Sequence, residues 1–286
     1  MKSTNSCEFF VIALNEEANI GDCIRSIMEQ SNGRVTVLDG GSTDRTVEIC
    51  HQMQCHVEVL PGSSISARRG RAVELAASDF LCFVDADQRL LSEYPIDEIV
   101  ARYFLERPAL AGVQLALNPI NAKRSYWVDG FAERLRIITG KPGPRVVIGT
   151  PCIFRSENAK VVGYDASLTG PSDDTLFCRK LLDRGFTLEA IPERGSEKVR
   201  ATFLSTVRKA DWYGMGDAEY IRTLKTPKTI RNHLFHVFIR GPILYPIQIL
   251  IRRPRLVPFF VLFGLARAFG LCRGLLSVND LSSRTS

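Results

Sequence analysis

The chain has 286 residues, of which 45% are hydrophobic and 24% are charged, with 21 glycines and 14 prolines. This composition is typical of a globular protein and excludes collagen-like, disordered and disulfide-scaffold classes. The net charge of +6 is unevenly spread: residues 198–286 hold fifteen basic and four acidic side chains, whereas residues 1–197 carry a net charge of −5. A basic C-terminal segment indicates an anionic partner for that segment, either nucleic acid or a membrane surface.

Short apolar runs alternate with stretches of helical spacing through the first 120 residues. The apolar runs are Phe9–Leu14, Val35–Leu38, Val57–Leu60, Phe80–Val84 and Leu110–Leu117. Repeated strand and helix patterns predict an α/β fold whose mostly parallel sheet is flanked by helices.

The eight cysteines are scattered without a CxxC pair, and several lie in apolar runs. A reduced thiol behaves there as a small hydrophobe, so we expect free thiols in a reducing compartment. Residues 1–17 hold one basic residue and a short apolar run that soon becomes acidic, so no export signal is expected.

Polar residues follow three of the predicted strands, where ligands bind in parallel sheets. They occupy residues 15–17, 39–44 and 85–87. Residues 39–44 (DGGSTD) are also compatible with a turn and a helix N-cap. The carboxylates of Asp85 and Asp87 could lie in a solvated turn, but they repel each other unless a cation lies between them. The sequence contains neither GxGxxG nor GxxxxGK[ST].

Three strings resemble the nucleotide-sugar-binding half of family 2 inverting glycosyltransferases, which have the GT-A fold. They are FFVIALNEEANIGDCIRSI, VTVLDGGSTDRTVEI and SISARRGRAVELAASDFLCFVDADQRL. Residues 149–155 (GTPCIFR) with 163–165 resemble the acceptor-side segment, and residues 172–174 before LFCRKLLDRGF resemble the family's acidic pair ahead of a helix. The resemblance covers residues 8–220.

The resemblance implies a nucleotide-binding role for four residues. Asn15, Glu16 and Asp39 would hold the base and ribose, and Arg68 would lie near the nucleotide or its phosphates. Departures from the family pattern leave the choice between UDP and GDP open. They are Ile12 in place of proline, Gly40 in place of a second aspartate, and Arg69 in place of asparagine.

The resemblance also implies a metal site and a general base. Asp85 and Asp87 would form the DxD motif that places Mn²⁺ or Mg²⁺ on the donor diphosphate, with Asp85 also contacting the nucleotide. Asp174 would accept the proton of the acceptor hydroxyl, with Asp173 as its neighbour. The alternative is an acidic pair that only favours the helix dipole.

The C-terminal segment contains the two most apolar stretches of the chain, residues 234–251 and 256–276. Their longest uncharged windows have 11 residues each, whereas a spanning helix needs about 20. We therefore expect helices lying in the interface of an anionic bilayer, with arginines at headgroup level. These arginines are Arg240, Arg252, Arg253, Arg255, Arg267 and Arg273. The alternative is core helices packed on the domain, and no nucleic-acid partner is expected because the segment is too apolar.

These patterns predict a GT-A domain over residues 1–230 and a membrane-associating helical tail over residues 231–286. The expected activity is metal-dependent, inverting sugar transfer from a UDP- or GDP-linked donor to a glycan, glycolipid or lipid-phosphate acceptor. The expected location is the cytoplasmic face of a membrane, in cell-surface glycan assembly. One alternative is a nucleotidyltransferase, which would carry a glycine-rich phosphate loop near the N-terminus. The other is a non-catalytic binding module, against which the intact acidic residues argue.

Overall fold

The computed structural model describes residues 6–120, 125–199, 201–224 and 226–277, which pack into two compact units. Unit 1 comprises Met1–Ile120, Leu135–Ser167 and Asp173–Lys198, and unit 2 comprises Asn121–Arg134, Leu168–Ser172 and Val199–Ser286. The functional division expected at residue 230 stays a prediction.

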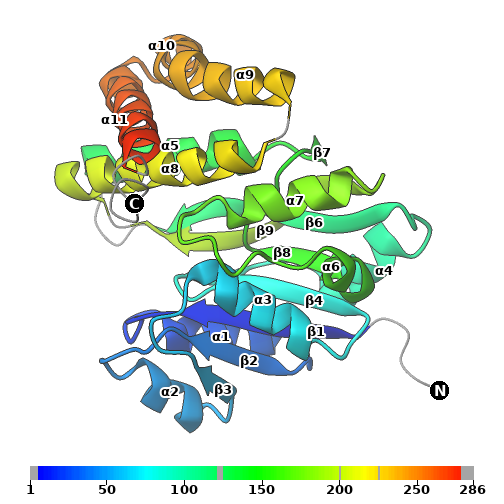
Figure 1. The fold of residues 1–286 in the computed structure, drawn as a ribbon. Coiled ribbons are helices and arrows are strands. Elements are labelled where there is room, and N and C mark those ends of the chain that lie inside the picture. The colour runs from blue at the N-terminus through cyan, green and yellow to red at the C-terminus, as the bar shows by residue number, and fades with distance from the viewer. Residues whose placement is uncertain (1–5, 121–124, 200, 225, 278–286) are drawn as a thin grey trace, which may run out of the picture. The chain divides into compact units, whose positions relative to one another are not determined.

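Unit 1 contains a nine-stranded mixed sheet with the order β3-β2-β1-β4-β8-β6-β9-β5, in which β7 also pairs with β9 (Figure 1). The strands are β1 (Cys7–Ala13), β2 (Val35–Asp39), β3 (His56–Val59), β4 (Phe80–Asp85), β5 (Gln88–Leu90), β6 (Leu110–Ile120), β7 (Gly143–Arg145), β8 (Cys152–Arg155) and β9 (Thr187–Lys198). Strands β1 to β4 run parallel, as do β6 and β9, whereas β5, β7 and β8 pair antiparallel with their neighbours. The five predicted strands and the mostly parallel sheet are confirmed.

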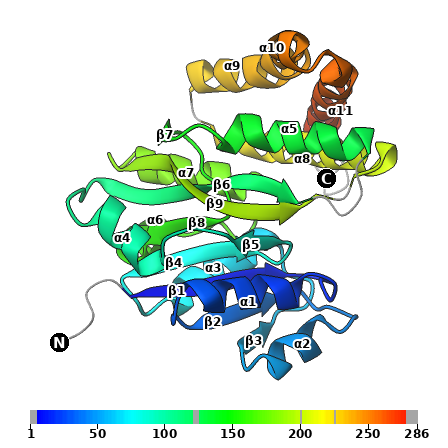
Figure 2. The same cartoon turned by 180° about the vertical axis from the view of Figure 1, so that it is seen from behind.

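Helices cover both faces of this sheet, as Figures 1 and 2 show from opposite sides. They are α1 (Ile20–Gln30), α2 (Thr46–Gln52), α3 (Ile65–Leu75), α4 (Ile96–Phe104), α6 (Ser156–Val162) and α7 (Asp173–Leu182). Successive strand side chains point to opposite faces. Phe9 and Val11 therefore pack with α1 and α4, while Phe10 and Ile12 pack with α3 and α7.

The register of the parallel strands brings the predicted polar groups to one edge of the sheet. Ala13 pairs with Asp39 on one side of β1, and Ile12 pairs with Asp85 on the other. The carboxyl ends of β1, β2 and β4 therefore lie side by side.

Unit 2 is helical. It contains the first part of α5 (Tyr126–Thr139), then α8 (Phe203–Thr223), α9 (Pro227–Phe235), the π-helix η1 (His236–Leu244), α10 (Tyr245–Arg252), the 3-10 turn η2 (Pro254–Leu256) and α11 (Val257–Leu276). Helices α8 and α11 approach closely because glycines face the opposing backbone. A Cβ on Gly214 would lie 2.0 Å from the Arg267 carbonyl oxygen, and one on Gly270 would lie 2.2 Å from that of Asp211.

Helix α11 is largely a core helix of unit 2. Phe259, Phe260, Phe263 and Leu271 are buried, which matches the alternative reading of residues 256–276 as a packed helix. The guanidinium of Arg267 lies 2.6 Å from Asp217, whose side chain is 3% exposed. The expectation that Arg267 lies at headgroup level is therefore wrong, because its charge is neutralised inside the unit.

Two helical runs of unit 2, Pro227–Arg252 and Pro254–Leu276, are long and apolar enough to cross a membrane by length and composition. Both runs exceed the roughly 20 residues that a spanning helix needs, so helix length alone does not exclude spanning.

Candidate active site

The turn after β2 is built around the carboxylate of Asp39, which is fully buried. Its Oδ2 accepts hydrogen bonds from the backbone N–H groups of Gly41 at 2.9 Å and Ser42 at 2.7 Å, and the Ser42 hydroxyl donates to Oδ1. Gly41 has a φ of +95°, in the left-handed region that glycine tolerates. Asp39 therefore orders this turn, and its predicted contact with a nucleotide stays a prediction.

Asn15 and Glu16 tie the end of β1 to this turn. The Asn15 side-chain oxygen accepts from the backbone N–H of Thr43 at 2.9 Å, and the Asn15 backbone N–H donates to the Ser42 hydroxyl at 2.8 Å. The Glu16 carboxylate accepts from the Asn19 amide at 2.5 Å. Asn15, Glu16 and Asp39 thus share one edge of the sheet, as the sequence predicted.

Arg68 on α3 is a buried charge with unsatisfied donors. Its residue surface is 4% exposed, and neither Nε nor Nη1 has a hydrogen-bond partner among the described residues. Burial lowers the pKa of the guanidinium below its usual value, opposed by the carboxylates of Asp39 and Asp85. A buried, unpaired cation is costly. These donors therefore favour binding of an anion.

Gly40 makes room for Arg68. A Cβ at Gly40 would lie 1.7 Å from Nη1 of Arg68, so any side chain at this position would displace the guanidinium. The structure thus gives a physical reason for a glycine at position 40.

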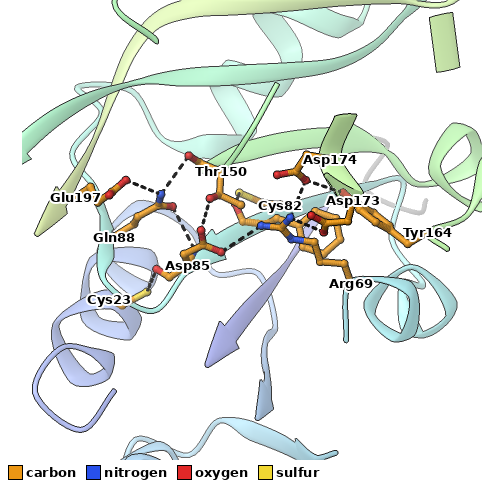
Figure 3. Close-up of polar contacts among 11 residues, drawn as sticks. Cys23, Arg69, Cys82, Asp85, Gln88, Thr150, Tyr164, Asp173, Asp174 and Glu197 are labelled. Atoms are coloured by element: carbon orange, nitrogen blue, oxygen red, sulfur yellow. Dashed lines mark hydrogen bonds and ion pairs between the residues drawn. The ribbon is translucent and has the colours of Figure 1, made fainter. Parts of the chain in front are cut away.

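Asp85, at the end of β4, is held from three directions, as Figure 3 shows. Its Oδ2 accepts from the Thr150 hydroxyl at 2.6 Å, its Oδ1 lies 3.4 Å from Nη2 of Arg69, and its backbone N–H donates to the Gln88 side-chain oxygen at 3.1 Å. Its side chain is 36% exposed, and Asp87 is also partly exposed. Both carboxylates are therefore within reach of solvent at the strand end.

The donor set at Asp85 and Asp87 fits a hard divalent cation. Carboxylate oxygens are preferred ligands of Mg²⁺ and Mn²⁺. Within the described part of the chain, no group of three or more His, Cys, Asp or Glu residues could hold a metal ion. An open pair of carboxylates is the arrangement by which proteins bind Mg²⁺ together with substrate phosphates, in place of a closed protein cage.

Arg69, also on α3, joins Asp85 to the acidic pair at the start of α7 (Figure 3). Its Nη1 lies 2.7 Å from Asp173 Oδ2 and 2.7 Å from Asp174 Oδ1. Its side chain is 6% exposed and that of Asp173 is 2% exposed, so this ion pair is buried. Burial acts to lower the pKa of Arg69, but the three surrounding carboxylates raise it well above the usual value. Arg69 therefore stays charged and fixes the acidic pair relative to Asp85.

Asp174 is the candidate general base predicted from the sequence. Burial raises its pKa to about 7, against the opposing charge of Arg69. Its Oδ1 faces Arg69 and the Tyr164 hydroxyl, which lies 3.4 Å away. A Cβ on Gly149 would lie 3.9 Å from Oδ2, so Gly149 lines the side of the other oxygen. A carboxylate with a pKa near neutrality is well matched to proton transfer at physiological pH.

The sequence interpretation missed Arg69, Thr150 and Gln88 as parts of this site. Helical spacing could have indicated Arg69, because it lies one turn before Val73 and therefore on the same buried face of the helix. A charged residue on the buried face of a helix needs partners of opposite charge. Thr150 lies in the acceptor-side string 149–155 and Gln88 in the string that ends DADQRL, but the resemblance gave neither residue a role.

Comparisons with known proteins agree with this geometry. The family model for glycosyl transferase family 2 matches residues 8–163. An uncharacterized glycosyltransferase of Rickettsia bellii is 23% identical over 231 residues, covering 80% of this chain and 72% of that protein. The lipopolysaccharide core biosynthesis glycosyltransferase LpsC of Rhizobium meliloti is 26% identical over 139 residues, covering 45% of this chain and 49% of LpsC.

Among solved structures, the mannosyltransferase PcManGT from Pyrobaculum calidifontis, in complex with GDP-Man and Mn²⁺, is similar with a TM-score of 0.66. It is 16% identical, and the match covers 95% of this chain and 87% of PcManGT, which shows a shared fold.

The fold is of the GT-A type. The chain belongs to glycosyl transferase family 2 and is an enzyme of the glycosyltransferase class. This finding favours sugar transfer over the nucleotidyltransferase and binding-module alternatives. The segment matched by the family model ends at residue 163, so the roles of Asp173 and Asp174 stay predictions.

Proposed function

We propose that this glycosyltransferase moves a sugar, with inversion and with a divalent cation, from a UDP- or GDP-linked donor to a hydroxyl or phosphate of a glycan or lipid-linked acceptor. The observation that carries the proposal is the chain of contacts from Asp85 through Arg69 to Asp174. The buried guanidinium of Arg69 thus joins a candidate metal-binding carboxylate, Asp85, to a candidate base, Asp174. The identity of the metal, Mn²⁺ or Mg²⁺, belongs to the proposal, which is supported by the Mn²⁺ complex of the similar mannosyltransferase.

In the proposed reaction, Asp85 and Asp87 are the residues that would hold the cation. The bound cation supplies charge stabilisation for the departing nucleoside diphosphate. The unpaired Nε and Nη1 of Arg68 donate hydrogen bonds to the phosphates, and Asn15, Glu16 and Asp39 border the nucleoside. These residues bind the donor and orient its leaving group.

Asp174 accepts the proton of the acceptor hydroxyl as it attacks the anomeric carbon. Arg69 holds Oδ1 of this carboxylate in place, leaving Oδ2 to face the acceptor beside Gly149. A single in-line displacement needs one protein base, and its outcome is inversion. Arg68 would stabilise the leaving group together with a cation held by Asp85 and Asp87.

We place this transfer at the cytoplasmic face of a membrane, in assembly of a cell-surface glycan. Support comes from the lipopolysaccharide core role in the name of the similar LpsC protein and from the apolar helices of unit 2. The eight cysteines, all unpaired, agree with a reducing compartment.

The test begins with thermal unfolding of the full chain in Mn²⁺ or Mg²⁺ with UDP, GDP and a panel of their sugars. A ligand at about 100 times its dissociation constant adds roughly 2.7 kcal/mol to the free energy of unfolding. Asp85→Asn and Asp87→Asn should lose the metal-dependent part of this gain and the transfer activity, because each removes an anionic ligand.

Asp183→Asn is the matched control, because Asp183 directly follows α7 and its ion pair with Arg179 is exposed. It should behave as wild type. Nucleotide binding and sugar transfer that are unchanged in EDTA would contradict the metal role.

A further inference from the structure

Unit 2 exposes a series of large apolar side chains on the helical run from α9 through η1 to α10. We define the apolar strip as Phe235, Phe238, Ile239, Ile243, Leu244, Ile247, Leu250 and Ile251, all of which are exposed. Ile251 is 89% exposed and Ile247 is 58% exposed. Contiguous apolar patches of this kind are rare on soluble monomers and mark binding surfaces.

We propose that the apolar strip is a membrane-docking surface that lies flat on an anionic bilayer. This inference concerns unit 2 by itself and stands whether or not the proposed sugar transfer is correct.

The other face of the same helical run is already occupied within unit 2. Val237 and Ile249 are buried, and the backbone at Pro242 meets α11 so closely that a Cβ on Gly264 would lie 2.5 Å from the Pro242 nitrogen. Because α11 covers one side of the run, the strip is the side left for a partner. A helix with one covered and one apolar face fits the plane of a membrane interface.

The charges beside the strip favour an anionic lipid surface. The sequence has no Asp or Glu between Glu219 and Asp280. Arg240 and Arg252 are exposed on the strip helices and have no acidic partner among the described residues. Juxtamembrane arginines attract anionic headgroups.

Other arginines of unit 2 are already paired. Arg253 lies 3.7 Å from Glu133, Arg255 lies 2.8 Å from Asp129, and Arg273 is bonded to Asp211. Changing them would perturb contacts inside the unit as well as any contact with lipid. Arg240 and Arg252 are therefore the better probes of headgroup attraction.

A lying helix also fits the position of Arg240. This residue lies near the middle of the run Pro227–Arg252, and an arginine at the centre of a bilayer is strongly unfavourable. At the interface the same guanidinium contacts phosphate while Ile243 and Ile247 enter the acyl boundary.

The experiment is vesicle flotation of the full-length protein at low and high salt. The vesicles contain phosphatidylcholine alone or phosphatidylcholine with phosphatidylglycerol. We expect binding to the anionic vesicles that weakens at high salt. Ile247→Ser and Ile251→Ser should each weaken vesicle binding roughly tenfold, since each removes a large apolar side chain from the face that enters the bilayer. Arg240→Gln and Arg252→Gln should each weaken it roughly fivefold.

The matched control is the pair Leu265→Ser and Phe269→Ser on α11. These residues have the same four-residue spacing and are 56% and 66% exposed. The control should bind vesicles as the wild type does. The strip variants should stay helical, because serine and isoleucine have similar helix propensities, and circular dichroism checks this for every variant.

Four results would overturn the proposal. One is failure of the folded wild-type protein to float with anionic vesicles at low salt. Another is an equal loss of binding in the α11 control, which would move the surface away from the strip. The third is resistance of the membrane-bound protein to alkaline carbonate extraction, which would show a spanning helix. A dimer that the strip substitutions convert to monomer, without vesicle binding, would identify a second copy of the chain as the occupant.

Discussion

Replacing Arg69 by methionine should destabilise the protein severely, although the residue lies on a surface helix of unit 1. The guanidinium makes two contacts of 2.7 Å with Asp173 and Asp174, whose side chains are 2% and 23% exposed. Removing one partner of a buried ion pair costs about 3–5 kcal/mol, because the remaining charges are left uncompensated. Methionine retains most of the apolar volume, so the loss reports chiefly on charge.

Arg71→Met is the control on the same helix. Arg71 pairs with Glu58 and Glu74, but its side chain is 40% exposed, and exposed pairs contribute about 0–1 kcal/mol. Urea unfolding of both variants should therefore separate them by at least about 2 kcal/mol. Adding Asp173→Asn to Arg69→Met should recover part of the loss, because it removes one of the stranded carboxylates.

The loss of unfolding free energy in Arg69→Met should also depend on pH. Without Arg69, the already raised pKa of Asp174 rises further, so the folded state binds a proton that the unfolded state has lost above about pH 4. Stability then falls as the pH rises, and the deficit should be smaller near pH 5 than near pH 8. Equal stabilities of the Arg69 and Arg71 variants, or a deficit that grows on acidification, would refute this account of the ion pair.

Further predictions concern the base, the unpaired arginine and the helix crossing of unit 2. Turnover should rise as the pH passes through about 7, because the buried carboxylate of Asp174 acts only when deprotonated. Asp174→Asn should remove this step and lower turnover by ~10²–10⁴ with donor affinity retained, as a pH-rate profile and ligand titration would show. Arg68→Gln should leave the unliganded protein as stable or more stable, since two of its donors are unpaired, yet weaken stabilisation by UDP and GDP in thermal unfolding. Gly270→Ala should destabilise unit 2, because its Cβ would meet the Asp211 carbonyl oxygen at 2.2 Å; unchanged helix melting by circular dichroism would contradict the close crossing.

The sequence predicts the sheet well, because its strands are continuous apolar runs. Phe80–Val84 and Val35–Leu38 each fall one residue short of the strands observed, and in both cases the missing residue is the aspartate at the strand end. Fully buried parallel strands have a strong local signal. Strand β8 carries a weaker one, because its four residues pair antiparallel with partners distant in sequence.

The acidic residues of the candidate site could be predicted from the sequence, but the contacts that join them could not. Asp85 and Asp174 stand in recognisable motifs, but the link between them is a long-range one through Arg69, separated by 16 residues from the first and 105 from the second. Such a pairing depends on how α3 and α7 pack on the same face of the sheet. Sequence spacing alone does not contain that information.

The contact between Gly40 and Arg68 makes these two positions interdependent in evolution. An aspartate at position 40 would place its Cβ 1.7 Å from the guanidinium nitrogen Nη1 of Arg68, so the arginine would have to move or be replaced by a shorter side chain. A double-mutant cycle on Gly40→Asp and Arg68→Lys should therefore be strongly non-additive. A protein with a side chain at position 40 is expected to place the arginine at position 68 differently. The proposed phosphate contact would then change while every carboxylate of the site stays the same.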